Sequence, residues 1–246
     1  MITRRFELFE RYPISCKAFL PDCEAVEKMI IGVHGFAGDK ESSMLKKLGR
    51  AAAAKGWGLV CFDFAAHGAS PQGADDLTVE HCIADLLAVA AWAKGTYPHA
   101  QLCVFATSFG GYISLLAAHA LDNIPMVLRA PAVTMDEVLL NAILHCSADE
   151  FRFAGTMECG FERKISLPYS FYEDLSCHTP FDRTYLPPML IIHGDCDRVV
   201  PPKDVARFCQ GRDNIRLTVM KGADHRFKNA GELERIVEAA MAFWEN

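Results

Sequence analysis

The sequence has little that would suit a membrane or a nucleic acid. Its longest apolar runs, such as Met29 to Val33 and Pro187 to Ile192, are far shorter than the roughly 20 residues that a membrane-spanning helix needs. Positive charge is not in excess, because 25 Lys and Arg residues face 31 Asp and Glu residues, for a net charge of -6. Proteins that neutralise phosphates or anionic lipid carry the opposite balance. We therefore expect no membrane span and no nucleic-acid partner.

The N-terminus lacks the features of a secretory signal. Charged residues occur throughout the first ten positions, and no apolar core leads to a small-residue cleavage site. The ten cysteines are spread from Cys16 to Cys209, without a CxxC pair and without the Cys and His spacing of a metal site. We expect a soluble, cytoplasmic protein with reduced thiols, no bound metal and no cofactor.

The chain does have enough apolar side chain for one large core. Hydrophobic residues make up 51% and charged residues 23% of its 246 positions, which excludes disorder. A chain of this length is still within the range of a single α/β domain. Internal repeats and low-complexity tracts are absent from the sequence.

Short apolar runs alternate with segments of helical periodicity. Two alternating segments, Arg4 to Phe9 and Ile14 to Phe19, flank a Tyr-Pro turn and predict an antiparallel hairpin. Further strands, buried on both faces, are predicted at 29–33, 58–62, 102–106, 126–128, 189–192 and 215–219. Helices are predicted at 41–55, 79–94, 109–120, 202–210 and 231–244. The alternation indicates an α/β fold with an eight-stranded, mostly parallel sheet and helices on both faces.

One long segment interrupts this alternation. Residues 131–187 contain no simple strand-helix unit, and a bare loop of that length is uncommon in a compact domain. We interpret the segment as a cap inserted between the core segments 1–130 and 188–246. Its eight clustered aromatic residues suit either the wall of an acyl pocket or a satellite core: Phe151, Phe153, Phe161, Tyr169, Phe171, Tyr172, Phe181 and Tyr185.

The strongest local motif is a serine between a predicted strand and a predicted helix. Ser108 lies in the stretch ATSFGG, which starts at Ala106. A sharp turn at this point exposes the hydroxyl group, and small residues at 106 and 110 let the strand and helix approach closely. Alanine at 106 replaces the usual glycine and adds only a methyl group. The motif predicts a nucleophilic serine, with an incidental serine in a Gly-rich turn as the alternative.

Acid and base candidates follow two later strands. Asp195 and Asp197 come after the strand at 189–192, and His225 comes after the strand at 215–219. Open α/β sheets form their sites at the carboxyl ends of strands. A serine hydroxyl near neutral pH needs a base to take its proton, and the base needs a carboxylate to fix its tautomer. Ser108, His225 and an aspartate after 192 fit these roles.

These motifs together resemble the α/β-hydrolase superfamily of serine hydrolases, and within it the cinnamoyl (feruloyl) esterase-like branch. The resemblance covers nearly the whole chain and rests on the Ser108 turn and on HGFAG from 34, DFAAHGAS from 63, LRAP from 128, HGDCDRVVP from 193 and GADH from 222. It implies Asp197, in preference to Asp195, as the acid. It also implies an oxyanion hole formed by the backbone N–H groups of Phe36 and Phe109.

The resemblance implies a carboxylesterase that acts through an acyl-enzyme on hydroxycinnamoyl (feruloyl) or other small acyl esters, without a cofactor. Monoacylglycerol lipases and acyl-peptide hydrolases share several of these motifs and remain alternatives, as does a catalytically silent ligand-binding relative. The expected partner is a small-molecule ester. Whether the chain also forms a homodimer is left open by the sequence. Asp63, His34, His67 and His193 are expected to brace loops, and Asp224 to form local hydrogen bonds.

Overall fold

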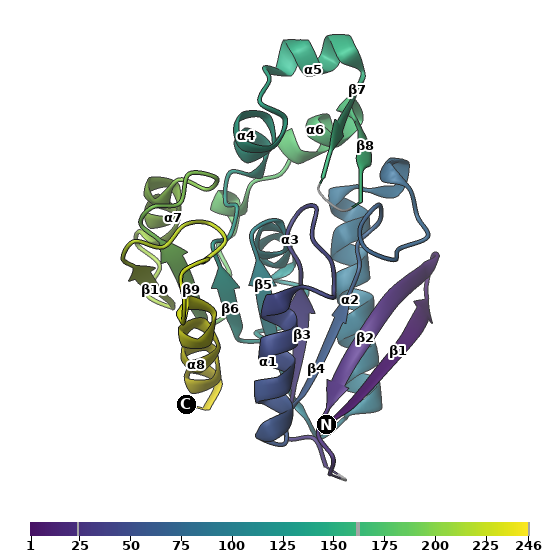
Figure 1. Cartoon of the computed structure of the whole chain (residues 1–246), viewed down its shortest axis with the longest axis vertical. Coiled ribbons are helices and arrows are strands. Elements are labelled where there is room, and N and C mark those ends of the chain that lie inside the picture. Colours follow the sequence, from purple (N-terminus) through teal and green to yellow (C-terminus); the bar gives the residue numbers. More distant parts are fainter. Residues whose placement is uncertain (24, 161–162, 246) are drawn as a thin grey trace.

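An eight-stranded sheet forms the centre of the computed structural model, which describes residues 1–23, 25–160 and 163–245 (Figure 1). The strand order is β1-β2-β4-β3-β5-β6-β9-β10. Strands β1 (Ile2–Phe9) and β2 (Pro13–Leu20) form the predicted hairpin, and β2 pairs antiparallel with β4. The other neighbours pair in parallel, so the predicted fold class is confirmed. These strands are β3 (Lys28–Val33), β4 (Gly58–Phe62), β5 (Gln101–Thr107), β6 (Met126–Arg129), β9 (Met189–Gly194) and β10 (Ile215–Met220).

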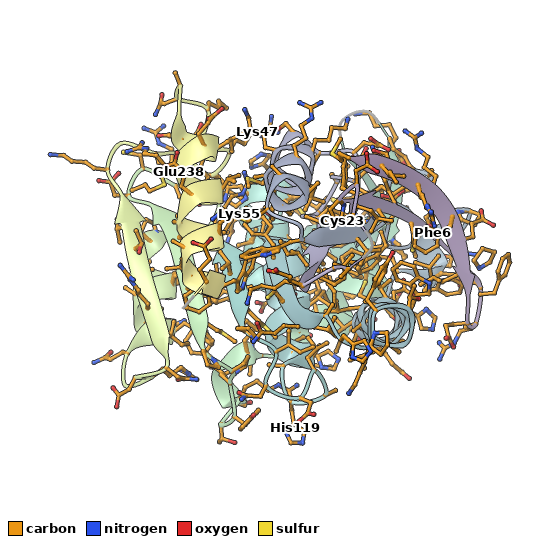
Figure 2. All side chains as sticks on the ribbon, turned by 90° about the horizontal axis from the view of Figure 1, so that it is seen from below. Phe6, Cys23, Lys47, Lys55, His119 and Glu238 are labelled. Carbon is orange, nitrogen blue, oxygen red and sulfur yellow. The ribbon has the colours of Figure 1, made fainter. Side chains whose placement is uncertain are left out.

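Helices cover both faces of the sheet, and they begin and end within three residues of the predicted bounds. One face is covered by α1 (Ser43–Ala54) and α8 (Glu232–Glu245). The other face is covered by α2 (Val79–Thr96), α3 (Phe109–Ala117) and α7 (Pro202–Cys209). Figure 2 shows Lys47 and Lys55 of α1 and Glu238 of α8 on one side of the sheet, and His119, which follows α3, on the opposite side.

Side chains alternate between two apolar layers along the central strands. In β3, Ile30 packs on the side of α1, while Met29 and Ile31 pack on the side of α2. The prediction of burial on both faces is wrong for β10, where Met220 is buried and Val219 is 55% exposed. The reason is its position, since β10 is an edge strand with a single neighbour, β9.

Residues 131–187 are called the insertion below, and most of the described ones lie beyond the carboxyl ends of the core strands, at the top of Figure 1. The last residues of the insertion lie at the opposite end of the sheet, where Asn214, just before β10, donates hydrogen bonds to the carbonyl oxygens of Leu186 and Pro187. A small hairpin of β7 (Thr156–Cys159) and β8 (Ile165–Pro168), which the sequence did not predict, lies within the insertion. Several buried side chains of the insertion, such as Phe151, belong to the same apolar cluster as the sheet. Its other elements are α4 (Met135–Val138), the π-helical η2 (Leu139–Leu144), α5 (Ala148–Ala154), α6 (Tyr169–Ser176) and the 3-10 turn η3 (Pro180–Asp182); a further 3-10 turn, η1 (Ala74–Asp76), precedes α2.

Candidate active site

Ser108 occupies a sharp turn between β5 and α3. Its backbone has φ of 50° and ψ of -115°, a conformation that is strained for a residue with a side chain. A Cβ atom on Gly110 would lie 2.4 Å from the carbonyl oxygen of His34, and one on Gly111 would lie 2.8 Å from Cβ of Pro131. Only glycine fits at these two positions, and their small size lets α3 start directly against its neighbours.

A chain of hydrogen bonds joins the three residues that the motifs singled out. Nε2 of His225 lies 3.1 Å from Oγ of Ser108, and Nδ1 of His225 lies 2.8 Å from Oδ2 of Asp197. Oδ1 of Asp197 accepts hydrogen bonds from the backbone N–H groups of Val199 and Val200, each at 2.9 Å. Both carboxylate oxygens of Asp197 therefore have partners.

Burial and hydrogen bonding act in opposite directions on Asp197. Burial raises the pKa of this carboxyl group, but His225 and the two backbone donors outweigh it and hold the pKa below its ordinary value. With an ionised Asp197 accepting from Nδ1, the Nε2 atom of His225 has its lone pair facing Ser108. The arrangement suits removal of the hydroxyl proton and nucleophilic attack by Ser108.

Asp195, the competing carboxylate, lies elsewhere. Its Oδ1 accepts a hydrogen bond from the backbone N–H of Gly222 at 2.6 Å, and no hydrogen bond joins it to His225. Asp224 also has local partners, since Oδ1 accepts from the backbone N–H of Arg226 at 2.9 Å and Oδ2 pairs with Lys228 at 3.0 Å. These contacts agree with the local role expected for Asp224.

His193 makes a contact that sequence reasoning missed. Its Nε2 lies 3.0 Å from the carbonyl oxygen of Val200 and 3.5 Å from Oδ2 of Asp197. The first contact closes the loop between 193 and 200, as expected of a bracing residue. Burial lowers the pKa of His193, so the ring is neutral beside the carboxylate. The spacing of four residues within HGDCD is the only signal of this contact in the sequence.

The loop after β3 is held by buried polar contacts. Asp63 accepts hydrogen bonds from the backbone N–H groups of Lys40 and Ala69, both at 2.8 Å, and forms an ion pair with the Lys40 side chain. His34 accepts a hydrogen bond at Nε2 from the backbone N–H of Phe64 at 3.2 Å. Nδ1 of His67 lies 2.7 Å from the carbonyl oxygen of Ala65. Asp63, His34 and His67 thus brace loops, as predicted.

The two residues whose amides are expected to face an oxyanion, Phe36 and Phe109, lie on either side of Ser108 in two different segments. A Cβ atom on Gly35 would lie 3.3 Å from Cβ of Ser108, so the loop before Phe36 runs directly past the serine. The rings of Phe36 and Phe109 are 5.8 Å apart. Within the described ranges, neither of these two backbone N–H groups donates a hydrogen bond to a protein acceptor. Both donors therefore remain available to a substrate oxygen.

A cavity of about 960 Å³ opens beside Ser108 and His225. Six Lys and Arg side chains line it, against three Asp and Glu side chains. The cations are Arg5, Lys40, Lys46, Arg129, Arg163 and Arg226, and the carboxylates are Asp39, Glu41 and Asp63.

The aromatic residues of the insertion do not form the wall of this cavity. Phe161 lies outside the described residues, and none of the other seven lines the cavity. Phe151 and Phe171 are buried in the apolar cluster of the core, and Phe153 is 95% exposed. The ring of Phe171 lies 6.1 Å from that of Phe36, so it supports the wall from behind. The acyl-wall interpretation does not hold for this cavity, because Phe151 and Phe171 pack on the core and Phe153 faces outward.

The described ranges contain neither a metal site nor a membrane-spanning helix. No group of three or more His, Cys, Asp and Glu side chains there has an arrangement that could hold a metal ion. None of the helices in those ranges combines the length and the hydropathy that crossing a bilayer requires.

The fold and the serine turn define this protein as an α/β-hydrolase. The chain belongs to the family described as serine aminopeptidase, S33, whose model matches residues 24–154, and it is a serine hydrolase by that membership. The resemblance to the α/β-hydrolase superfamily is thereby confirmed. No curated protein gives a significant sequence match.

Solved structures share the fold over nearly the whole chain. Est1E from Butyrivibrio proteoclasticus is 21% identical, over 98% of this chain and 97% of that chain, with a TM-score of 0.81. A structure of ferulic acid bound to Est1E from the same organism is 24% identical, over 94% and 95%, with a TM-score of 0.82. Alpha/beta hydrolase domain-containing protein 10 from mouse is 17% identical, over 98% of each chain, with a TM-score of 0.79.

Proposed function

We propose that this protein is a carboxylic-ester hydrolase in which Ser108 is the nucleophile, His225 the general base and acid, and Asp197 the residue that orients His225. The observation that carries the proposal is the continuous hydrogen-bonded chain from Ser108 to Asp197 on a strained turn. Membership of a serine hydrolase family supports it.

In the proposed reaction, Oγ of Ser108 attacks the ester carbonyl carbon while Nε2 of His225 takes the hydroxyl proton. The backbone N–H groups of Phe36 and Phe109 donate to the oxyanion. The carbon–oxygen bond to the alcohol then breaks as His225 returns the proton to the leaving oxygen. Water attacks the acyl-enzyme with His225 again as base, and Ser108 recovers its proton as the carboxylic acid leaves.

Esters of small acyl groups, including hydroxycinnamoyl groups, are the proposed substrates. The structure of ferulic acid bound to Est1E supports an aromatic acyl group, because that fold matches over nearly all of both chains. Phe36 offers an aromatic side chain on the cavity wall. The insertion is proposed to act as a cap that supports this wall through Phe171.

The family description also suggests aminopeptidase activity as an alternative. An aminopeptidase would bind the positively charged amino terminus of a peptide. The cavity does not favour such a substrate. Asp63 pairs with Lys40, and Glu41 pairs with Arg5, Lys17 and Lys46, so these carboxylates already have cationic partners. Neutral or anionic esters fit this charge balance better. Monoacylglycerols and acylated peptides also lack a free amine and belong in the same substrate panel.

Covalent labelling tests the nucleophile. A fluorophosphonate probe, followed by peptide mapping with mass spectrometry, is expected to modify Ser108. Ser108→Ala is expected to lose on the order of 10⁶ in turnover of 4-nitrophenyl butyrate. Ser166→Ala, an exposed serine in β8, is the matched control and should keep full activity. Labelling of another residue, or an active Ser108→Ala variant, would contradict the proposal and favour the ligand-binding alternative.

A substrate panel tests the class. Methyl ferulate, 4-nitrophenyl acyl esters, a monoacylglycerol, an acyl-peptide anilide and an amino-acid anilide are compared by kcat/KM. Preference for the simple esters is expected. Preference for either anilide would replace the esterase proposal with a peptidase.

A further inference from the structure

Arg129 is a partly buried cation beside Ser108. It ends β6, where it is in register with Thr107 of β5, and its backbone oxygen accepts a hydrogen bond from the N–H of Ser108 at 3.0 Å. Its side chain lies against the ring of Phe227, with the guanidinium carbon 5.5 Å from the ring centre. The same side chain lines the cavity that Ser108 and His225 share.

The guanidinium group has no anionic partner in the protein. Across the residues that the structure describes, no carboxylate lies within ion-pair distance of Arg129 and no acceptor takes a hydrogen bond from its side chain. Its Nε atom is fully buried and unpaired. The contact with Phe227 is favourable, but an aromatic ring does not replace hydrogen-bond acceptors for five N–H donors.

The nearest acids are committed to other groups. Asp197 and Asp224 attract Arg129 through space, yet Asp197 is bonded to His225 and two backbone donors, and Asp224 is paired with Lys228. Burial lowers the pKa of Arg129 to about 10, which leaves the group charged at neutral pH. Burying part of a charged group, here the Nε atom, is costly unless that part is paired or hydrogen-bonded. The counter-ion is therefore missing from the protein itself.

Other cations of the cavity wall differ in this respect. Lys40 pairs with Asp63, Arg5 and Lys46 pair with Glu41, and Arg163 donates hydrogen bonds to backbone carbonyl oxygens. The wall still carries more cations than carboxylates, although the whole chain has a net charge of -6. A concave surface of one sign concentrates ligands of the opposite sign.

We infer that Arg129 binds a carboxylate or phosphate group of the substrate, so that the preferred esters are anionic. This inference rests on the proposed function and names its substrate class. A planar guanidinium group with five donors matches a carboxylate or phosphate through two parallel hydrogen bonds. The anion belongs either to the acyl part, as in a monoester of a dicarboxylic acid, or to the alcohol part, as in an ester of a hydroxy acid.

Paired esters test the acyl part. The mono-4-nitrophenyl esters of succinate, glutarate and adipate are compared with 4-nitrophenyl butyrate, valerate and hexanoate, each corrected for its spontaneous hydrolysis. The wild-type protein is expected to prefer the anionic ester at one or more chain lengths. Arg129→Met should lower that selectivity about 10- to 100-fold. Arg129→Lys, which keeps the charge but not the planar group, should retain part of it.

A second series tests the alcohol part. Butyrate release is measured from butyryl glycolate and from the neutral butyryl glycolamide with the same variants. A selectivity loss confined to one series identifies the part of the ester that carries the anion. Arg207→Met is the matched control, because Arg207 lies over Phe181 at 4.7 Å but is absent from the cavity wall. It removes the same charge and should leave both selectivities unchanged.

Binding separates this inference from the proposed function. Binding is measured by calorimetry. The Ser108→Ala variant should bind monomethyl glutarate more tightly than methyl butyrate, and the double variant Ser108→Ala, Arg129→Met should show no difference in affinity. Binding that follows Arg129 without any hydrolysis by the wild type would overturn only the esterase proposal. The inference would be overturned if the wild type hydrolysed and bound charged and neutral compounds equally well in every series. It would also be overturned if Arg129→Met lowered the activity on charged and neutral esters in parallel.

Discussion

At the scale of single residues, two aspartates that are two positions apart, Asp195 and Asp197, have different surroundings. Asp197 accepts a hydrogen bond from His225 at 2.8 Å, whereas Asp195 accepts one from the backbone of Gly222. We predict that Asp197→Asn lowers kcat for 4-nitrophenyl butyrate by about 10⁴-fold, because the amide would favour the wrong tautomer of His225. The kcat of Asp195→Asn is expected to stay within about tenfold of the wild-type value, because this substitution removes only a loop contact. A larger loss in the Asp195 variant would contradict this assignment.

The residues of the site differ in how well the sequence predicts them. Ser108, Asp197 and His225 each follow a strand, and a parallel sheet brings the carboxyl ends of its strands to one edge. Their proximity therefore follows from order and motif. The unpaired state of Arg129 and the contact of His193 with Asp197 depend on how side chains pack, and no spacing rule gives that information.

At the scale of elements, a buried carboxyl group joins α2 to the turn between β1 and β2. The group belongs to Asp85 of α2, and its partner in the turn is Tyr12. The hydroxyl group of Tyr12 donates to Oδ2 of Asp85 at 3.1 Å, and burial raises the pKa of Asp85 to about 7. An acid with a raised pKa contributes stability that is fully present below its unfolded pKa of about 4 and is lost as pH rises through the folded value. The loss from Asp85 is at most about 4 kcal/mol.

We predict that Asp85→Asn weakens this pH dependence, because an amide does not ionise. The melting temperature of the wild type should fall between pH 5 and pH 8 by more than that of the variant. Asp75→Asn, at an exposed position in η1, is the control and should follow the wild type. Parallel curves for Asp85→Asn and the wild type would show that Asp85 is ionised throughout.

A single arginine connects the insertion to the loop after β4. Arg163 donates hydrogen bonds to the carbonyl oxygens of His67, Gly68 and Ser70 at 2.9 to 3.1 Å, and to that of Gln72 at 3.3 Å. We predict that Arg163→Met lowers the free energy of unfolding by about 2 to 4 kcal/mol, because these acceptors lose a charged donor. Urea titration measures this change.

The neighbouring lysine provides the control for Arg163. Lys164→Met removes an exposed side chain that donates to the carbonyl of Gly160, and it should change stability by less than about 1 kcal/mol. Equal stability of the two variants would contradict a connecting role for Arg163.

The elements also differ in predictability. The long core helices and strands carry clear periodicity, so their bounds follow closely from the sequence. The insertion consists of short pieces, such as the four-residue strands β7 and β8, in which no period has room to appear. Its aromatics indicate burial, but composition does not say which surface they cover.

At the scale of the whole molecule, overall and local charge have opposite signs. The net charge of -6 favours neutral or cationic ligands on composition alone. The cavity is nevertheless rich in cations, because Arg5, Lys46, Arg129 and Arg163 come from distant parts of the chain and meet only in the fold. The sequence predicts the sheet that brings them together, but not which long side chains turn into the cavity.

This contrast leads to a prediction about salt. If the cavity attracts anionic esters, kcat/KM for mono-4-nitrophenyl glutarate should fall roughly two- to fivefold between 20 and 200 mM NaCl, because salt shortens the range of the attraction. The value for 4-nitrophenyl valerate should change little, since that ester has no charge to screen. The negative surface outside the cavity would produce the reverse trend, because screening its repulsion would speed the anionic ester. A rise with salt would therefore show that the net charge, and not the cavity, governs how substrates approach.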